Sequence, residues 1–262
     1  MKILVAIKQV PEKDSRLVLD ASRTGIVETD LAWETNESDR YALETGLRLK
    51  ETLGAGECVA CTIGPERARR SISSALAMGC DRGVHLFDPA FQGGDPLTIA
   101  RTLTALVRRE EPSLVLFGTR SDDAGYGETA LLTAGLLGWP AVFLAIGVEV
   151  KDGELEVVRE LEAARQEVSR VPLPAVLAIQ SGIYPVRYTS LKGIMAAKKK
   201  PVDQPTPTEL GLSAETIGRA GARVQTLELS PPVKKSQCEF LEGDAAAVAH
   251  QLVEKLRARG IM

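Results

Sequence analysis

The chain has 262 residues, of which 44% are hydrophobic and 26% charged, and its net charge is −3. This balance is typical of a globular protein, and the interspersed charges with only 4% aromatic residues argue against nucleic acid as a partner. No run approaches the roughly 18 apolar residues of a membrane span, and residues 1–7 lack the features of a signal peptide. We therefore expect a cytoplasmic protein without a membrane segment.

The first 150 residues alternate short apolar runs with amphipathic stretches. The apolar runs predict strands at residues 2–10, 58–63, 84–87, 114–117 and 141–146. The amphipathic stretches predict helices at residues 38–51, 64–78, 95–109 and 126–137. Asn36 or Ser38 is the expected cap of the first helix, and Asp95 with Pro96 starts the third. Strands that alternate with helices predict an α/β fold, with a parallel sheet covered by helices on both faces.

After residue 147 the pattern changes. Strands are expected at residues 148–150, 154–161, 166–171 and 175–179, with a hairpin turn at 151–153. Residues 182–201 are rich in turn formers and predict a loop, and the prolines of 201–207 indicate a linker. The tail from residue 208 has too few apolar residues for a core of its own, although 244–259 is an amphipathic helix. We expect this tail to lie on a partner subunit.

Two of the four cysteines, Cys58 and Cys61, form a C-x-x-C pattern that could indicate a redox or zinc site. They lie in an apolar strand, however, where positions three apart face opposite sides of a sheet. No second pair completes a zinc site, so buried structural cysteines are favoured. The two histidines, His85 and His250, are far apart in sequence and are also expected to be structural.

Ligands of an open parallel sheet bind at the carboxyl ends of its strands, which here are Ala6, Ile63 and Gly118. Residues 118–129 contain three glycines, a serine and threonines before a helix, a composition suited to a phosphate. The loop lacks a Walker A pattern, so a nucleotide site and an ordinary loop both remain open. The adjacent acids Asp122 and Asp123 have no third partner, and we expect no metal site.

No Ser-His-Asp set, Cys-His set or acid–base pair is apparent, so no catalytic residue is predicted and a binding or carrier role is favoured.

Residues 183–201 place Leu191 among short polar residues, followed by Ile194, Met195 and a lysine cluster. An apolar anchor beside lysines is typical of a docking loop for an acidic partner. The alternative is a surface loop followed by solvated lysines.

Several of these segments resemble the β subunit of electron-transferring flavoproteins. The run from Arg187 to Met195, ending in Lys198-Lys199-Lys200-Pro201, is similar to the partner-recognition loop of that family. The segments 2–10, 48–51, 75–83 and 133–140 are similar as well, and they occur in the same order along nearly the whole chain.

The resemblance implies a flavodoxin-like, adenine-nucleotide-hydrolase-like domain at residues 1–182, a recognition loop at 183–201 and an arm at 202–262 that packs on an α subunit. It implies a structural AMP in this subunit and an FAD held mainly by the α subunit. The implied AMP site consists of Ala6, Asn36, Glu37, Ser38, Asp39, Ile63, Gly118, Ser121, Asp122, Gly125, Tyr126, Gly127, Glu128 and Thr129. The implied docking residues are Arg187, Tyr188, Leu191, Ile194, Met195 and Lys198, with Leu191 as the anchor.

In this family the heterodimer carries electrons from primary dehydrogenases of the acyl-CoA or amine type to a quinone-linked oxidoreductase, and the β subunit is a carrier rather than an enzyme. A bifurcating branch holds a second FAD in place of AMP and oxidises NADH. Its Ile-Asp-Gly-Asp-Thr run is replaced here by residues 121–125, which favours AMP. A third reading is a stand-alone adenine-nucleotide-binding stress protein. The tail and the docking loop argue against it.

One turn departs from the family pattern. The usual acidic-Gly-Gly turn after the Arg-Glu pair corresponds here to residues 159–164, which contain Ala163 and Ala164. Because alanine does not readily adopt a positive φ, we expect this turn to be built differently. Lys13, Ser38 and Asp39 occupy positions where some members place aromatic or cysteine side chains toward the flavin, and no flavin contact is expected of them.

Overall fold

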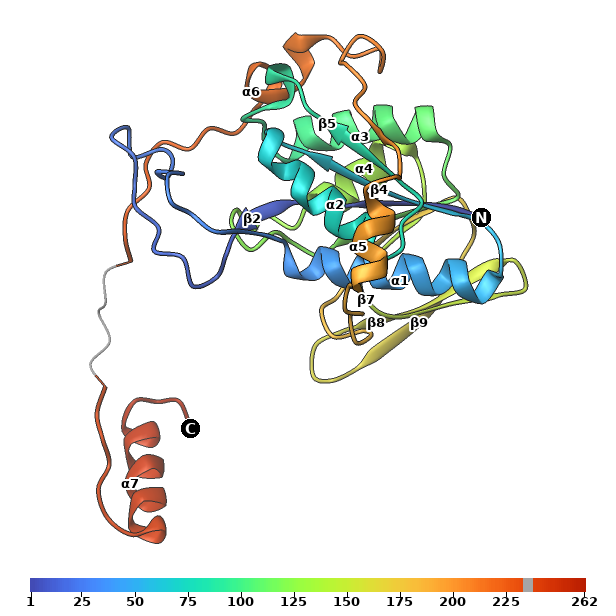
Figure 1. Cartoon of the computed structure of the whole chain (residues 1–262). Helices are drawn as coiled ribbons and strands as arrows, with labels where there is room; N and C mark the ends of the chain where they lie inside the picture. Colours follow the sequence, from blue (N-terminus) through green and yellow to red (C-terminus); the bar gives the residue numbers. More distant parts are fainter. Residues whose placement is uncertain (233–237) are drawn as a thin grey trace.

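A sheet of nine strands forms the centre of the computed structural model, which describes residues 1–232 and 238–262. The strand order is β11-β5-β4-β1-β6-β10-β7-β8-β9 (Figure 1). The strands are β1 Lys2–Ala6, β4 Glu57–Ile63, β5 Arg82–Leu86, β6 Leu114–Gly118, β7 Ala141–Lys151, β8 Glu154–Glu160, β9 Gln166–Val171, β10 Ala175–Ile179 and β11 Val202–Asp203. The pairs from β11 to β7 are parallel, whereas β8 and β9 extend the sheet antiparallel. The predicted α/β class with a parallel sheet is confirmed.

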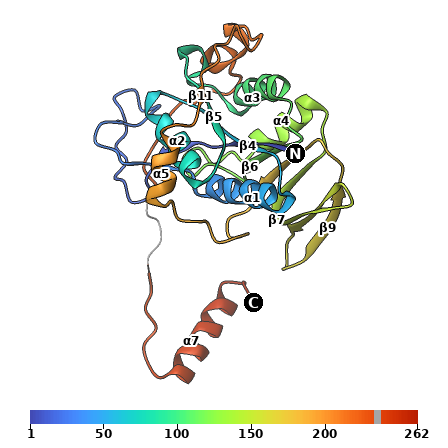
Figure 2. The same ribbon diagram turned by 45° about the vertical axis from the view of Figure 1, so that its right-hand side comes forward.

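Helices cover both faces of the sheet, as Figure 2 shows from a second angle. The helices are α1 Glu37–Leu53, α2 Arg69–Met78, α3 Pro96–Glu110, α4 Thr129–Leu137, α5 Leu191–Ala197, α6 Gly218–Gly221 and α7 Ala245–Ala258. Single 3-10 turns occur at η1 Glu66–Ala68, η2 Pro89–Phe91 and η3 Ala214–Thr216. A small antiparallel pair, β2 Gln9–Pro11 and β3 Trp33–Thr35, lies outside the main sheet.

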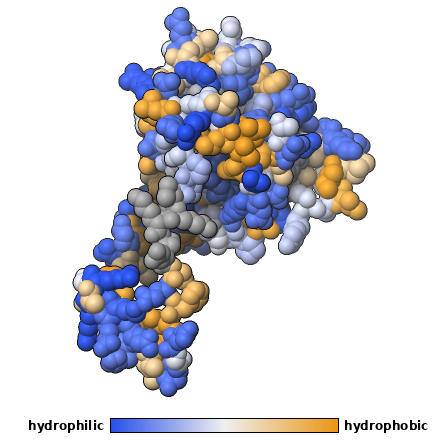
Figure 3. Space-filling view, turned by 90° about the vertical axis from the view of Figure 1, so that its left-hand side faces the viewer, coloured by the Kyte–Doolittle hydropathy of each residue, from blue (hydrophilic) through white to orange (hydrophobic). Residues whose placement is uncertain are grey.

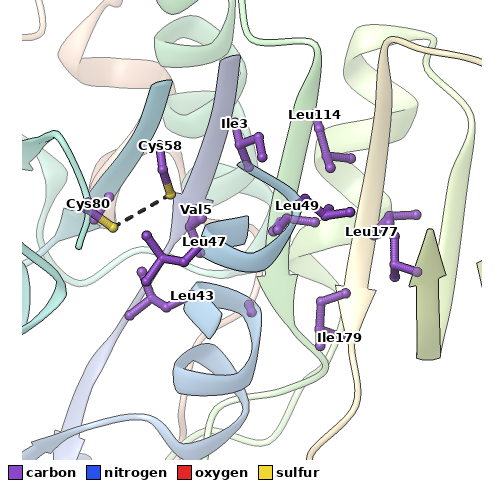
Figure 4. Packing of buried hydrophobic residues seen from close by; sticks show 14 of the residues in the cluster. Ile3, Val5, Leu43, Leu47, Leu49, Cys58, Cys80, Leu114, Leu177 and Ile179 are labelled. Carbon is purple, nitrogen blue, oxygen red and sulfur yellow. Dashed lines mark hydrogen bonds between the residues drawn. The ribbon is translucent and has the colours of Figure 1, made fainter. Parts of the chain in front are cut away.

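The core has two halves because alternate residues of each strand point to opposite faces. In β1, Ile3 and Val5 pack with α1 and α2, whereas Leu4 packs with α3 and α4. Figure 4 shows the first half, where Leu43 and Leu47 of α1 lie over the strands. All of these side chains are almost completely removed from solvent, and their burial supplies the main drive for the fold.

The cysteine prediction is confirmed by this two-sided packing. Cys58 lies in the α1 half of the core and Cys61 in the other half, and both are fully buried. The sulfur of Cys58 is 3.7 Å from that of Cys80, also a buried free thiol (Figure 4). Burial raises the pKa of Cys61 well above its ordinary value, as expected of an unreactive core thiol. His85 is buried too and its Nε2 contacts the carbonyl of Gly64, whereas His250 lies at the surface.

Several predicted boundaries are wrong. The run 2–10 is two strands, β1 and β2, and the fourth helix begins at Thr129 instead of 126. Residues 141–151 form the single strand β7; a register shift against β10 around Leu144, with φ of 61°, marks a bulge within it, and pairing with β8 continues to Lys151. The expected loop 182–201 contains helix α5, and the expected linker 201–207 contains strand β11.

The turn at residues 159–164 also differs from expectation. Ala163 and Ala164 both adopt the left-handed conformation, with φ of 58° and 56°. Two consecutive positive φ angles match the twist of the antiparallel strands β8 and β9 that the turn joins. The amide of Leu161 donates to the carbonyl of Arg165 at 2.9 Å and closes the turn. The hairpin therefore keeps the geometry that glycines favour while using alanines, at a cost in backbone strain.

The C-terminal part divides into two stretches. Residues 202–224 pack on the α/β body, where Ile217 is fully buried and Asp95 accepts hydrogen bonds from the amides of Arg223 and Val224. Helix α7 lies apart from the body in Figure 1, and none of its residues is buried. The predicted arm 202–262 thus begins with a segment that belongs to the body, and it includes residues 233–237, which lie outside the described residues.

Candidate functional site

A cavity of about 300 Å³ lies at the carboxyl ends of the adjacent strands β4, β1 and β6. The last residues of these strands, Ile63, Ala6 and Gly118, all line it. Parallel strands bring their carboxyl ends to one edge, where the following loops and helix N-termini converge. The sheet topology therefore places the cavity where the sequence predicts ligand binding.

Gly118 is required where β6 meets α1. A Cβ at this position would lie 2.2 Å from Oγ of Ser38 and 2.3 Å from Oδ1 of Asp39. No real side chain tolerates such distances, so only glycine lets the strand end approach the start of α1 this closely. This contact fixes the floor of the cavity.

Asp39 is a buried carboxylate at that floor. Its two oxygens accept the backbone N–H of Lys8 at 2.7 Å and of Gly118 at 3.1 Å, which ties α1 to the ends of β1 and β6. Burial raises the pKa of Asp39 to about 7, because the low-polarity surroundings disfavour the charged form more than these hydrogen bonds favour it. A buried group with such a perturbed pKa beside a cavity is typical of a functional site.

Asn36 holds the loop that follows β6. Its Oδ1 accepts the amide of Asp122 at 2.9 Å, and its Nδ2 donates to the carbonyl of Arg120 at 2.9 Å. Ser38 donates to the same carbonyl through its hydroxyl at 2.9 Å. Asn36 is the N-cap residue of α1, as predicted, but neither side chain makes a capping hydrogen bond to the helix. Both side chains are used to position the loop instead.

The polar end of the cavity carries positive charge. Lys8 and Arg120 both line it, and Nζ of Lys8 forms an ion pair of 2.7 Å with Asp123. Although burial acts in the opposite direction, the Lys8 ammonium holds the pKa of Asp123 below its ordinary value. The start of α4 also faces this region, since Thr129 and Ala130 line the cavity. Cationic groups beside a helix N-terminus are suited to an anion.

The cavity also has apolar lining, part of which comes from a segment that the sequence analysis missed. Phe91 of η2 and the start of α3 contribute this wall, together with Phe117 of β6. The glycine pair Gly93-Gly94 just before the Asp95 cap was the available signal, because it follows the carboxyl end of β5 at the same edge of the sheet. The apolar lining residues here are Ile63, Phe91, Pro96, Ile99, Leu103 and Phe117.

Most of the predicted ligand residues line the cavity. Those that do are Ala6, Asn36, Asp39, Ile63, Gly118, Ser121, Tyr126, Gly127 and Thr129. Glu37, Ser38, Asp122, Gly125 and Glu128 do not line it, because they lie behind the loop or at its outer turn. Ser38 supports the loop through Arg120, and the Asp122 carboxylate faces the amide of Glu37 at 3.4 Å.

The predicted docking segment forms helix α5, with Ser190 as its N-cap accepting the amide of Gly193 at 3.0 Å. Tyr188 is 99% exposed and Leu191 83% exposed, and Ile194, Met195 and Lys198 also face solvent. Arg187 differs from this set, because its guanidinium turns inward to the carboxylates of Glu44 and Glu51 on α1. Arg187 thus lies at the base of the segment, and its role in docking stays a prediction.

Over the ranges 1–232 and 238–262, no three His, Cys, Asp or Glu side chains gather in a way that would hold a metal ion. None of the helices described within these ranges has the length and apolar character needed to cross a membrane.

Comparison with known proteins agrees with this architecture. Residues 24–210 match the family described as "Electron transfer flavoprotein domain". The electron transfer flavoprotein subunit beta of Methylophilus methylotrophus is 32% identical over 257 residues, which cover 97% of each chain. The subunit of the same name from Bacillus subtilis is 32% identical over 98% of each chain, and the human one is 35% identical over 81% of this chain and 84% of its own.

The family match includes helix α5 and most of the cavity lining, and it agrees with the resemblance drawn from separate motifs. Since the family match covers well over half of the chain and the relatives align almost end to end, this chain belongs to the electron transfer flavoprotein family, as a β-type subunit.

Proposed function

We propose that this chain is the β subunit of a heterodimeric electron transfer flavoprotein, that it holds a structural AMP in the cavity, and that it docks primary dehydrogenases through α5. The family gives the coarse role, which is electron transfer that involves a flavin and a partner subunit. The finer role is argued below from the cavity, from the docking helix and from the tail.

The combination of apolar and cationic side chains in the cavity lining carries the proposal for AMP. Phe91, Ile99 and Phe117 offer flat or branched apolar surface suited to a purine base. Lys8, Arg120 and the start of α4 offer positive charge suited to a phosphate. The residues present therefore fit a mononucleotide.

The size of the cavity favours AMP over a second FAD. Its volume of about 300 Å³ is at the lower end of the range of roughly 300–1,000 Å³ typical of ligand sites. A cavity at the lower end of this range favours the smaller of the two ligands, AMP, over FAD. The proposal is therefore a carrier subunit of the non-bifurcating type, whose redox chemistry is supplied by the FAD held mainly by the α subunit.

The tail supports a heterodimer. Val248, Leu252 and Leu256 recur every four residues on α7, and Leu252 is 48% exposed in the single chain. Figure 3 shows apolar and hydrophilic side chains together at the surface of this helix. An apolar stripe on a helix without buried residues is explained by a partner surface, here that of the α subunit. A stand-alone nucleotide-binding protein would have no use for it.

The electron route of the proposal runs from dehydrogenases of the acyl-CoA or amine type, through the flavin of the α subunit, to a quinone-linked oxidoreductase. The β subunit contributes a rigid base, the nucleotide and the exposed Leu191 on α5. No described side chain of the cavity is assigned a catalytic role. The chain is thus proposed to act as an electron carrier subunit.

Counting the bound ligands tests this proposal. The heterodimer is purified with its α subunit, the ligands are released with acid, and nucleotides are separated and quantified. One FAD and one AMP for each heterodimer are expected. Two FAD for each heterodimer would replace the proposal with a bifurcating complex, and a stable flavin-free monomer would replace it with a nucleotide-binding protein that needs no partner.

A further inference from the structure

Helix α5, Leu191–Ala197, is held on the body at three separate points, which we call the clamp. The clamp consists of Arg187 before the helix, Gly193 within it and Lys200 after it. The three residues contact α1 or α2, and α5 packs across α2. The helix has only seven residues, which is too short for a helix to persist in water without tertiary support.

The first point is an ion pair between Arg187 and a buried glutamate. Glu44 of α1 is 1% exposed and accepts Nε of Arg187 at 2.8 Å and the backbone N–H of the same residue at 3.1 Å. Glu51, about two turns further along α1, accepts Nη1 of Arg187 at 2.6 Å. Glu44 also receives Nε of Arg48 at 2.7 Å. The planar guanidinium thus bridges two carboxylates while its own backbone is fixed, which a lysine cannot reproduce.

The second point is a close approach between two helices. A Cβ on Gly193 would lie 2.5 Å from the carbonyl oxygen of Ala77 in the last turn of α2. Any larger residue at this position must push α5 away from α2, because the obstructing atom belongs to the backbone. The absence of a side chain at residue 193 therefore sets the distance between the two helices.

The third point caps the end of α2. The ammonium of Lys200 donates to the carbonyl of Leu76 at 2.9 Å and to that of Cys80 at 2.5 Å. These carbonyls lie at the C-terminus of α2, where a cation is favoured by the helix dipole. Lys200 thereby ties the chain that leaves α5 to the same helix that α5 crosses. Lys192, Lys198 and Lys199 are exposed and take no part in this contact.

We infer that Arg187, Gly193 and Lys200 are positioning residues, which hold α5 folded and oriented before a partner arrives. The inference rests on the proposed docking function of α5. Holding the helix in advance removes an ordering cost from association, so Leu191, Ile194 and Met195 meet the partner as a formed surface. None of the three positioning residues needs to touch the partner for this effect.

Hydrogen exchange of the intact heterodimer tests the clamp. The variants are Arg187→Lys and Gly193→Ala. The first keeps the charge but loses the planar guanidinium that bridges Glu44 and Glu51, and the second acts without any change of charge. The control is Arg170→Lys, since Arg170 lies on strand β9 and is 61% exposed. We expect the amides of residues 194–197 to exchange at least tenfold faster in both clamp variants and at wild-type rates in the control. The core strand β10 keeps its protection in all three variants.

Two outcomes would overturn the inference. The first is unchanged exchange of residues 194–197 in both clamp variants. The second is equal acceleration in α5 and in β10, which would mean that the substitutions lower global stability without a specific effect on the helix. Because two chemically different variants are used, misfolding of one leaves the other to decide.

Electron transfer supplies a second readout. The donor is whichever of an acyl-CoA dehydrogenase and an amine dehydrogenase reduces the wild-type heterodimer. A clamp variant should raise the KM for that donor about fivefold or more, with kcat at saturation unchanged. A reduced kcat at unchanged KM would contradict a positioning role. If Leu191→Ala leaves transfer intact while the clamp variants still loosen α5, the docking proposal fails and the clamp stands as a device of the fold alone.

Discussion

The ammonium of Lys8 lies 2.7 Å from the carboxylate of Asp123 and joins the end of β1 to the loop that follows β6. Because Lys8 also lines the cavity, a phosphate bound there competes with Asp123 for the same cation. The ion pair is partly exposed and adds little to stability, so Lys8 is available to a ligand at small cost.

Lys8→Met is therefore expected to weaken AMP binding. Loss of one charge-assisted hydrogen bond to phosphate corresponds to about a tenfold rise in the dissociation constant. The measurement is the AMP retained for each FAD after prolonged dialysis of the heterodimer. Lys151→Met, on the hairpin between β7 and β8, removes a lysine far from the cavity and should retain the wild-type amount. Equal retention by both variants would remove Lys8 from the site.

Gly118→Ala is expected to destabilise the fold, because its Cβ would meet Ser38 and Asp39 at distances below 2.5 Å. Overpacking of this kind costs about 1–3 kcal/mol or more. The matched control is Gly135→Ala in α4, where nothing lies within 4 Å of a new Cβ. That substitution should raise the free energy of unfolding by about 0.5–1 kcal/mol, since alanine favours helix. Urea unfolding of the two variants should thus give shifts of opposite sign.

Asp39 should make stability depend on pH. Its pKa is about 7 in the fold and 3.8 ordinarily, so between these values the native chain binds more protons than the unfolded chain. The contribution of Asp39 to the free energy of unfolding therefore falls as pH rises from about 4 to 7, by up to about 1.4 kcal/mol per pH unit. Urea unfolding of wild type and Asp39→Asn from pH 5 to 8 isolates this contribution. The free energy of unfolding of wild type minus that of the variant should decline with rising pH and level off above pH 7. A difference that stays constant over this range would refute the assignment to Asp39.

Leu191→Ala should impair electron transfer from the donor dehydrogenase without changing flavin content or stability. The side chain is 83% exposed, so its loss removes no packing within this chain. An anchor that fills a partner pocket commonly contributes 2 kcal/mol or more to binding, about a thirtyfold change in affinity. Leu17→Ala, at a leucine that is 56% exposed in the loop after β2, serves as the control. Unaltered transfer rates in Leu191→Ala would end the anchor assignment.

The alternation of apolar and amphipathic segments predicted the α/β body well, because strands with completely buried centres and amphipathic helices leave clear local patterns. Asp95 illustrates this: its side chain accepts the amide of Thr98, as an N-cap should. The short helix α5 was not predicted, since it depends on contacts with α1 and α2 that lie far away in the sequence.

The cavity was predicted in part for a similar reason. Residues at strand ends, such as Ala6 and Gly118, follow from the rule that ligands bind at the carboxyl edge of a parallel sheet. The wall formed by Phe91 and Gly94 depends on how the loop after β5 folds back, for which the glycine pair before Asp95 is only a weak local signal. Asn36 lines the cavity whereas Ser38 does not. This difference depends on side-chain geometry and could not be predicted from the sequence.

Strand β10 lies between β6 and β7 and is hydrogen-bonded to both. Residues 175–179 thus join the sheet of the first 118 residues to the hairpins of residues 141–171, which precede β10 along the chain. During synthesis on the ribosome, these two portions have no strand-to-strand link until β10 has emerged. Insertion of β10 between β6 and β7 brings together residues that are far apart in the sequence, and the closure of such long loops is slow. Strand β10, which is made after both portions that it joins, is therefore the strand on which completion of the native sheet depends.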